Sequence, residues 1–174
     1  MTIPAAKVCG AEKGENTMTR DELEKRNVGE NLDAIMCLDP RGYGVCRILY
    51  AGSRAYTGEP TAMHAAEALC KAIHPGDPVY ILVGFVLLPN KVSEMDGSVS
   101  AILLARSLVL AFGAKPIIVC PQDSVEAFKK CGNVVGLHVY EDLDTAMELP
   151  LSLGVVAFTK DKAKAPAQAK ALAD

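Results

Sequence analysis

The stretch VYILVGFVLLPNKVSEMDGSVSAILLAR, from Val79 to Arg106, decides the fold because it has the pattern of a strand, a loop and a helix. Its first part, Val79 to Phe85, is a continuous apolar run with β-branched and aromatic residues, which is typical of a strand buried on both faces of a parallel sheet. From Ser98 onward the apolar residues recur at helical spacing, and Phe112-Gly113 marks a helix end. We therefore predict a buried strand that leads through a short loop into a helix.

The loop of this stretch is where we expect a ligand. In open α/β sheets ligands bind outside the carboxyl ends of the strands, and the N–H groups of the next helix attract anions there. The loop carries Glu94, Asp96 and Gly97. Ser93 and Asp96 also have capping-box spacing, so a purely structural role for Asp96 stays open. In the functional interpretation Asp96 pairs with a substrate ammonium or a divalent cation, and Glu94, farther from the helix dipole, transfers a proton.

Further strands and helices alternate along the rest of the chain. We predict strands over residues 116–120, 136–140 and 154–158, and helices over residues 123–131 and 142–149. Ahead of the central stretch we predict helices over residues 19–37 and 60–73, with a short strand or irregular segment at 45–50 and a loop at 51–54. Such alternation is typical of βαβ units.

These elements predict a three-layer, Rossmann-like α/β domain with a mainly parallel sheet, over residues 18–159. Residues 1–17 have no periodicity, which favours a flexible N-terminal arm. Residues 160–174 are rich in Ala and Lys, and Pro166 interrupts them, which favours a frayed tail.

Composition excludes several classes of partner. The chain of 174 residues has a formal net charge of −3 and 5% aromatic residues, which argues against nucleic acid. It has no charge-free apolar run long enough to span a membrane and no apolar leader, so we expect a soluble, cytoplasmic protein. The six cysteines form no C-x-x-C pair, so we expect reduced thiols and no zinc site. No nucleotide-binding glycine motif is present.

Three further residues are candidates for binding a ligand. Gly84 and Gly97 flank the loop, where a missing side chain lets the backbone turn tightly or a ligand approach closely. Arg54, in the other predicted loop, would bind a carboxylate through two parallel hydrogen bonds, although an ordinary surface arginine is the alternative.

Several blocks of residues carry a family resemblance. They are Asp39-Pro40-Arg41-Gly42, Ser53-Arg54, Gly58-Glu59-Pro60, Ala65-Ala66, Val83-Gly84-Phe85 and Glu94-Met95-Asp96-Gly97-Ser98-Val99-Ser100-Ala101 followed by Leu104-Ala105. Together they resemble the glutamate cyclase domain family, related to the C-terminal part of D-glutamate cyclase, over roughly residues 31–119. The last block looks like the family's Glu-Thr-Asp-Gly-Pro-x-Gly-Ala, with Met95, Ser98 and Ser100 as departures. The family's later Gly-Asp-Gly-Gly-Asn-Glu segment has no counterpart.

The resemblance implies a hydro-lyase that interconverts D-glutamate and 5-oxo-D-proline, or acts on a related small amino acid or carboxylate. In this hypothesis Glu94 and Asp96 are catalytic. The implied substrate-binding residues are Arg54, Gly84, Phe85, Gly97 and Ser98. A dependence on a divalent cation stays open.

Two alternatives to a hydro-lyase remain. The absent segment favours a non-catalytic or partner-dependent subunit, and the helix start at Gly97 suits a domain that binds a small anion or a nucleotide. In either case we expect a homo-oligomer or a complex with a second subunit.

Overall fold

A computed structural model describes residues 18–84, 86–87 and 92–173. The predicted arm over residues 1–17 and the candidate residue Phe85 lie outside this range. Contacts divide the chain into two compact units, Met1–Leu69 and Cys70–Asp174, where the sequence predicted one domain over residues 18–159.

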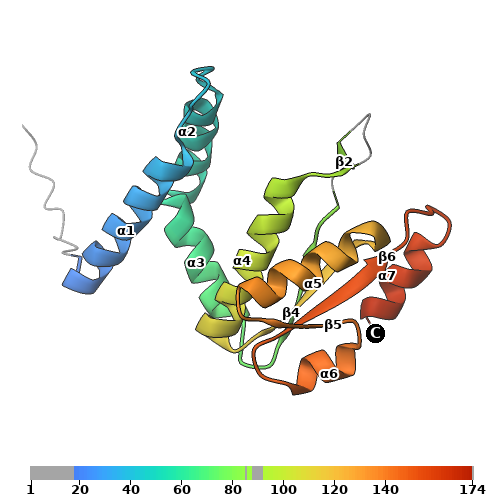
Figure 1. Cartoon of the computed structure of the whole chain (residues 1–174). Helices are drawn as coiled ribbons and strands as arrows, with labels where there is room; N and C mark the ends of the chain where they lie inside the picture. The colour runs from blue at the N-terminus through green and yellow to red at the C-terminus, as the bar shows by residue number, and fades with distance from the viewer. Residues whose placement is uncertain (1–17, 85, 88–91, 174) are drawn as a thin grey trace, which may run out of the picture. The chain divides into compact units, whose positions relative to one another are not determined.

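The N-terminal unit is helical and contains α1 (Arg20–Met36), α2 (Val45–Thr57) and most of α3 (Thr61–Ala72) (Figure 1). A capping box starts α1: the side chain of Thr19 accepts the N–H of Glu22, and the Glu22 side chain accepts the N–H of Thr19. This confirms the helix predicted over residues 19–37. Glycines with φ of 75° and 73°, Gly44 and Gly58, bracket α2, since both adopt the left-handed conformation that favours glycine.

Helix α2 corrects the prediction for residues 45–54. This segment is neither a strand nor a loop, so Ser53 and Arg54 lie on a helix. The β-branched residues Val45 and Ile48 suggested a strand. Helical spacing is instead followed by the apolar residues Val45, Ile48, Leu49 and Tyr56. The period of 3.6 residues is visible only when residues 45–57 are read together.

The C-terminal unit is built on a parallel sheet of four strands. They are β1 (Pro78–Leu82), β4 (Lys115–Pro121), β6 (Ser152–Phe158) and β5 (His138–Tyr140), in that spatial order. The connecting helices are α4 (Met95–Phe112), α5 (Val125–Val134) and α6 (Leu143–Glu148), with a 3-10 turn, η1 (Gln122–Ser124), before α5. A further helix, α7 (Ala165–Ala173), follows β6. The short antiparallel strands β2 (Val86–Leu87) and β3 (Val92–Ser93) lie between β1 and α4 in the sequence.

Helices cover both faces of this sheet, as the alternation of side chains along β6 shows. Leu153 and Val155 belong to the buried core that also contains residues of α4 and α5. Gly154 points the other way, because a Cβ built on it would lie 2.9 Å from Cδ2 of Leu143 in α6. Helix α7 covers the same face as α6, next to Phe158. The predicted three-layer, Rossmann-like α/β architecture with a parallel sheet is therefore confirmed (Figure 1).

Strand β1 corrects the prediction of a strand buried on both faces over Val79 to Phe85. It ends at Leu82, and its residues alternate between exposed and half-buried. The reason is its place in the sheet: within the described residues β1 pairs only with β4, so it is an edge strand.

The tail predicted as frayed contains α7. Two side chains hold this helix to the sheet. The Gln168 amide accepts the N–H of Thr159 at 2.8 Å and donates to the carbonyl of Ala157 at 2.7 Å, and the Tyr80 hydroxyl donates to the carbonyl of Leu172 at 2.7 Å. Pro166 is the second residue of the helix, where the N–H that proline lacks has no intrahelical acceptor. It therefore fits the first turn and does not interrupt the helix.

Among the described residues, α4 is long and apolar enough to cross a membrane by length and composition. Its buried residues Ala101, Ile102, Ala105 and Leu108 face the interior of the C-terminal unit, and three of them belong to its core cluster.

Gly132 provides a test of the packing between α5 and β5. A Cβ built on Gly132 would lie 2.3 Å from Cγ2 of Val139. We expect Gly132→Ala to lower the free energy of unfolding by about 1–3 kcal/mol through overpacking, even though Ala is favoured in helices by about 1 kcal/mol. Denaturant unfolding measures this, with Gly52→Ala as control, since nothing lies within 4 Å of that helical position. Equal stabilisation by both substitutions would contradict the close packing.

Candidate functional site

A cavity of about 350 Å³ lies in the C-terminal unit between the carboxyl end of β1 and the first turns of α4. Apolar side chains and the carboxylates of two acidic residues line it. The lining residues are Ile81, Leu82, Val83, Gly84, Glu94, Asp96, Gly97, Ser100, Ala101 and Leu104. The structure thus brings together four residues that the sequence singled out, namely Gly84, Glu94, Asp96 and Gly97.

The start of α4 sets the geometry of the two carboxylates. Glu94 is the N-cap residue, with extended backbone (φ −69°, ψ 130°), and not Ser93 as the predicted capping box required. Among the described residues no hydrogen bond or ion pair holds the Glu94 carboxylate. Asp96 is held in part, because its Oδ1 accepts the N–H of Gly97 at 2.6 Å. Glu94 is therefore the freer of the two acids in the cavity.

Two other predicted residues have structural roles at this point. The Ser98 hydroxyl donates to the carbonyl of Glu94 at 3.2 Å, which fixes the first turn of α4. A Cβ on Gly84 would lie 3.1 Å from Cδ of Pro121, so glycine lets the end of β1 approach the end of β4 closely.

This arrangement suits a small zwitterion. The two carboxylates can accept hydrogen bonds from an ammonium group. The N–H groups of the first helical turn lack intrahelical acceptors and attract a carboxylate, apart from that of Gly97, which Asp96 occupies. A ligand with both groups, such as an amino acid, matches the two kinds of partner.

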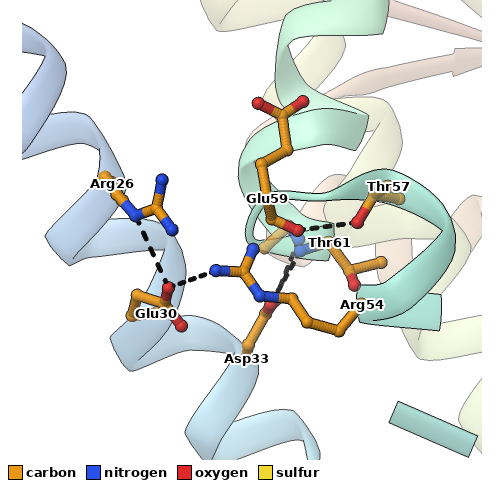
Figure 2. Close-up of polar contacts among 8 residues, drawn as sticks. Arg26, Glu30, Asp33, Arg54, Thr57, Glu59 and Thr61 are labelled. Carbon is orange, nitrogen blue, oxygen red and sulfur yellow. Dashed lines mark hydrogen bonds and ion pairs between the residues drawn. The ribbon is translucent and has the colours of Figure 1, made fainter. Parts of the chain in front are cut away.

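Arg54 belongs to the N-terminal unit, and its guanidinium forms an ion pair within that unit. Its Nη2 lies 2.6 Å from Oε1 of Glu30, which Arg26 also approaches at 3.8 Å (Figure 2). Its Nη1 is buried and has no hydrogen-bond partner in the described part of the chain. Binding of a substrate carboxylate by Arg54 stays a prediction.

Asp33, in the same unit, was not predicted from the sequence as a residue with a special role. Its buried carboxylate accepts the N–H groups of Thr61 at 2.7 Å and Ala62 at 2.9 Å, and so caps α3 from α1 (Figure 2). Burial opposes ionisation, but these N–H groups, the Tyr50 hydroxyl and the charge of Arg54 outweigh it and lower the pKa of Asp33 below its ordinary value. The sequence signal was the helix start at Pro60-Thr61, which has no local Ser, Asp or Asn cap.

A second cavity, of about 340 Å³, lies at the carboxyl ends of β1, β4 and β6. It shares Leu82, Val83 and Gly84 with the first cavity and adds Val119, Cys120, Pro121, Phe158, Thr159 and Lys160. Burial raises the pKa of the Cys120 thiol to about 11, so it is protonated at neutral pH and a poor nucleophile. The sequence placed Lys160 in a frayed tail and therefore did not connect it with a site.

A third cavity, of about 240 Å³, is almost entirely apolar and lies between the sheet and α7. No group of three or more His, Cys, Asp or Glu residues that could hold a metal ion occurs within the described residues.

The layers and the ligand-sized cavity at the carboxyl end of β1 place the C-terminal unit among the Rossmann-like α/β proteins. More specifically, residues 32–172 match the family described as D-glutamate cyclase-like, C-terminal, and the chain belongs to this family. The match continues beyond residue 119 and includes most of α7. No curated protein and no solved structure matches the chain.

Proposed function

We propose that this protein is a hydro-lyase that interconverts D-glutamate and 5-oxo-D-proline, or a related small amino acid and its lactam. The family supports the reaction class, and the observation that carries the proposal is the Glu94 carboxylate, which lines a cavity and has no partner among the described residues. A volume of about 350 Å³ is at the lower end of the range for ligand sites and suits a small amino acid.

The proposed reaction needs two protons to move. The ammonium of D-glutamate loses one proton, and the resulting amine attacks the side-chain carboxyl carbon. The nitrogen loses the second proton as the C–N bond forms, and a C–O bond then breaks. One carboxyl oxygen then leaves with the two protons as water. Glu94 is the proposed proton carrier, because a positioned carboxylate can take a proton from nitrogen and return it to oxygen.

The other groups of the site orient the substrate amine and stabilise the charge that develops during the reaction. Asp96 holds the amine, since its position is fixed by the N–H of Gly97. The N–H groups at the start of α4 stabilise the negative charge that develops on the attacked carboxyl group. A divalent cation between Glu94 and Asp96 is part of the proposal, and the assay below includes it.

The test is direct turnover by the full chain. We expect the purified protein to form 5-oxo-D-proline from D-glutamate and to catalyse the reverse reaction, with less activity on the L enantiomers. The assay is run with and without a divalent cation, and the solution mass is measured in parallel. A folded protein without turnover under all these conditions would contradict the proposal.

A partner-dependent subunit is the second candidate. Two observations favour it: the Gly-Asp-Gly-Gly-Asn-Glu segment of the family has no counterpart, and α2 carries exposed apolar side chains, with Ile48 73% and Tyr56 92% exposed. Exposed apolar surface is often covered in an assembly. This candidate predicts no turnover by the chain alone and a mass above that of the monomer, or turnover that appears when a second protein is added.

A further inference from the structure

Lys160 is the cation that borders the second cavity. It follows β6 by two residues, and its Nζ lies 2.9 Å from Oδ2 of Asp123, which belongs to η1 after β4. Lys160 lines the cavity and Asp123 does not, so the cation of this ion pair belongs to a residue at the cavity and its carboxylate partner to one outside it.

The contact with Asp123 is easily exchanged. Both side chains are exposed, 60% for Lys160 and 59% for Asp123, and exposed ion pairs contribute only about 0–1 kcal/mol. The contact occupies one of the three N–H donors of the ammonium group. A second carboxylate can therefore bind Lys160 in addition to Asp123 or in its place.

The surroundings favour a carboxylate in this cavity. Val119, Pro121 and Phe158 give the cavity apolar walls beside Lys160, and these can contact the methylene groups of a ligand. Thr159 adds a hydroxyl group: its Oγ1 accepts the N–H of Asp161 at 3.1 Å, and its own hydrogen is not used in a hydrogen bond among the described residues. The cavity also lies at the carboxyl ends of parallel strands, where ligands of such sheets bind.

The two cavities have a common wall, formed by Leu82, Val83 and Gly84 at the end of β1. We propose that the second cavity is the carboxylate subsite of the ligand site, in which Lys160 binds a carboxylate of the substrate in exchange for Asp123. This inference rests on the proposed function, since a substrate with an amine and two carboxylates needs a cation besides the acids Glu94 and Asp96. Lys160 supplies that cation from the same unit, whereas Arg54 is engaged by Glu30.

Equilibrium binding to the full-length variants tests the subsite. D-glutamate and glutarate, a dicarboxylate without an amine, are titrated into the wild type, Lys160→Met and Lys164→Met by calorimetry. We expect Lys160→Met to raise the Kd of both ligands at least about tenfold, since a hydrogen bond to a charged group is worth about 1.5–3 kcal/mol. Lys164→Met removes the same charge from a side chain that is 77% exposed, and we expect its Kd to change less than about twofold.

Asp123→Asn separates ligand binding from a structural role of the ion pair. If Lys160 binds the ligand, loss of the competing carboxylate tightens binding, so the two substitutions act in opposite directions. If the pair only holds β4 and β6 together, both substitutions weaken binding alike. Parallel effects, an unchanged Kd in Lys160→Met, or no binding by the wild type would overturn the subsite.

The outcome is independent of turnover. Loss of binding in Lys160→Met without any cyclisation by the wild type would support the subsite and contradict the hydro-lyase. Turnover by the wild type with unaltered binding in Lys160→Met would support the hydro-lyase and contradict the subsite.

Discussion

Replacement of Glu94 by Gln is expected to lower the rate of cyclisation by about 10²- to 10⁴-fold, which is the usual contribution of a positioned general acid or base. Gln preserves the size and the hydrogen-bonding oxygen of the side chain but cannot take up a proton at neutral pH. Because the Glu94 carboxylate has no partner among the described residues, the substitution breaks no side-chain contact seen in the structure, and the loss should appear in kcat with the fold intact.

Asp96→Asn should behave differently. The Asn side-chain oxygen can still accept the N–H of Gly97, so the helix start is kept, but the attraction to the substrate ammonium is lost. We expect the larger effect on KM. Glu148→Gln, an exposed carboxylate of α6, is the matched control and should leave both constants unchanged. Full activity in both Glu94→Gln and Asp96→Asn would remove these residues from the mechanism.

Much of the C-terminal unit could be predicted from the sequence because the apolar periods of its strands and helices differ clearly. The strand at residues 115–121 and the helix ending at Gly113 are of this kind. Local patterns could not distinguish an edge strand from a central one, since the position of β1 depends on the order of all four strands. The same holds for α7, because Gln168 bonds to Ala157 in β6, 11 residues away, and Tyr80 bonds to Leu172, 92 residues away.

The candidate site was predictable in part. Glu94, Asp96 and Gly97 are adjacent in the sequence and follow a strand, so a general rule for α/β sheets located them. Lys160 reaches the same edge of the sheet only through the parallel pairing of β4 and β6, which places Pro121 opposite Phe158. Asp33 caps a helix that starts 28 residues later, and that contact has no local spacing to reveal it.

Asp33→Ala is expected to lower the free energy of unfolding of the N-terminal unit by roughly 3 kcal/mol. Two backbone N–H groups, those of Thr61 and Ala62, lose a charged acceptor, and each such hydrogen bond is worth about 1.5–3 kcal/mol. Asp33→Asn keeps one carbonyl oxygen and should lose about half as much. Asp21→Ala, which removes an exposed carboxylate from the first turn of α1, should cost less than about 1 kcal/mol. Equal stability of the Asp33 and Asp21 variants in denaturant unfolding would contradict the capping role.

The pH dependence of unfolding gives an independent test of the same contact. Since the pKa of Asp33 is lower in the folded chain than in the unfolded one, the unfolded state binds the proton more readily. The stabilisation is therefore complete above the unfolded pKa of about 4 and is lost as the pH falls through the lower, folded value. We expect wild-type stability to decrease in this acidic range and the decrease to be smaller in Asp33→Asn. Hydrogen exchange at the N–H groups of Thr61 and Ala62 should accelerate in the variant at neutral pH, because exchange there requires the cap to open.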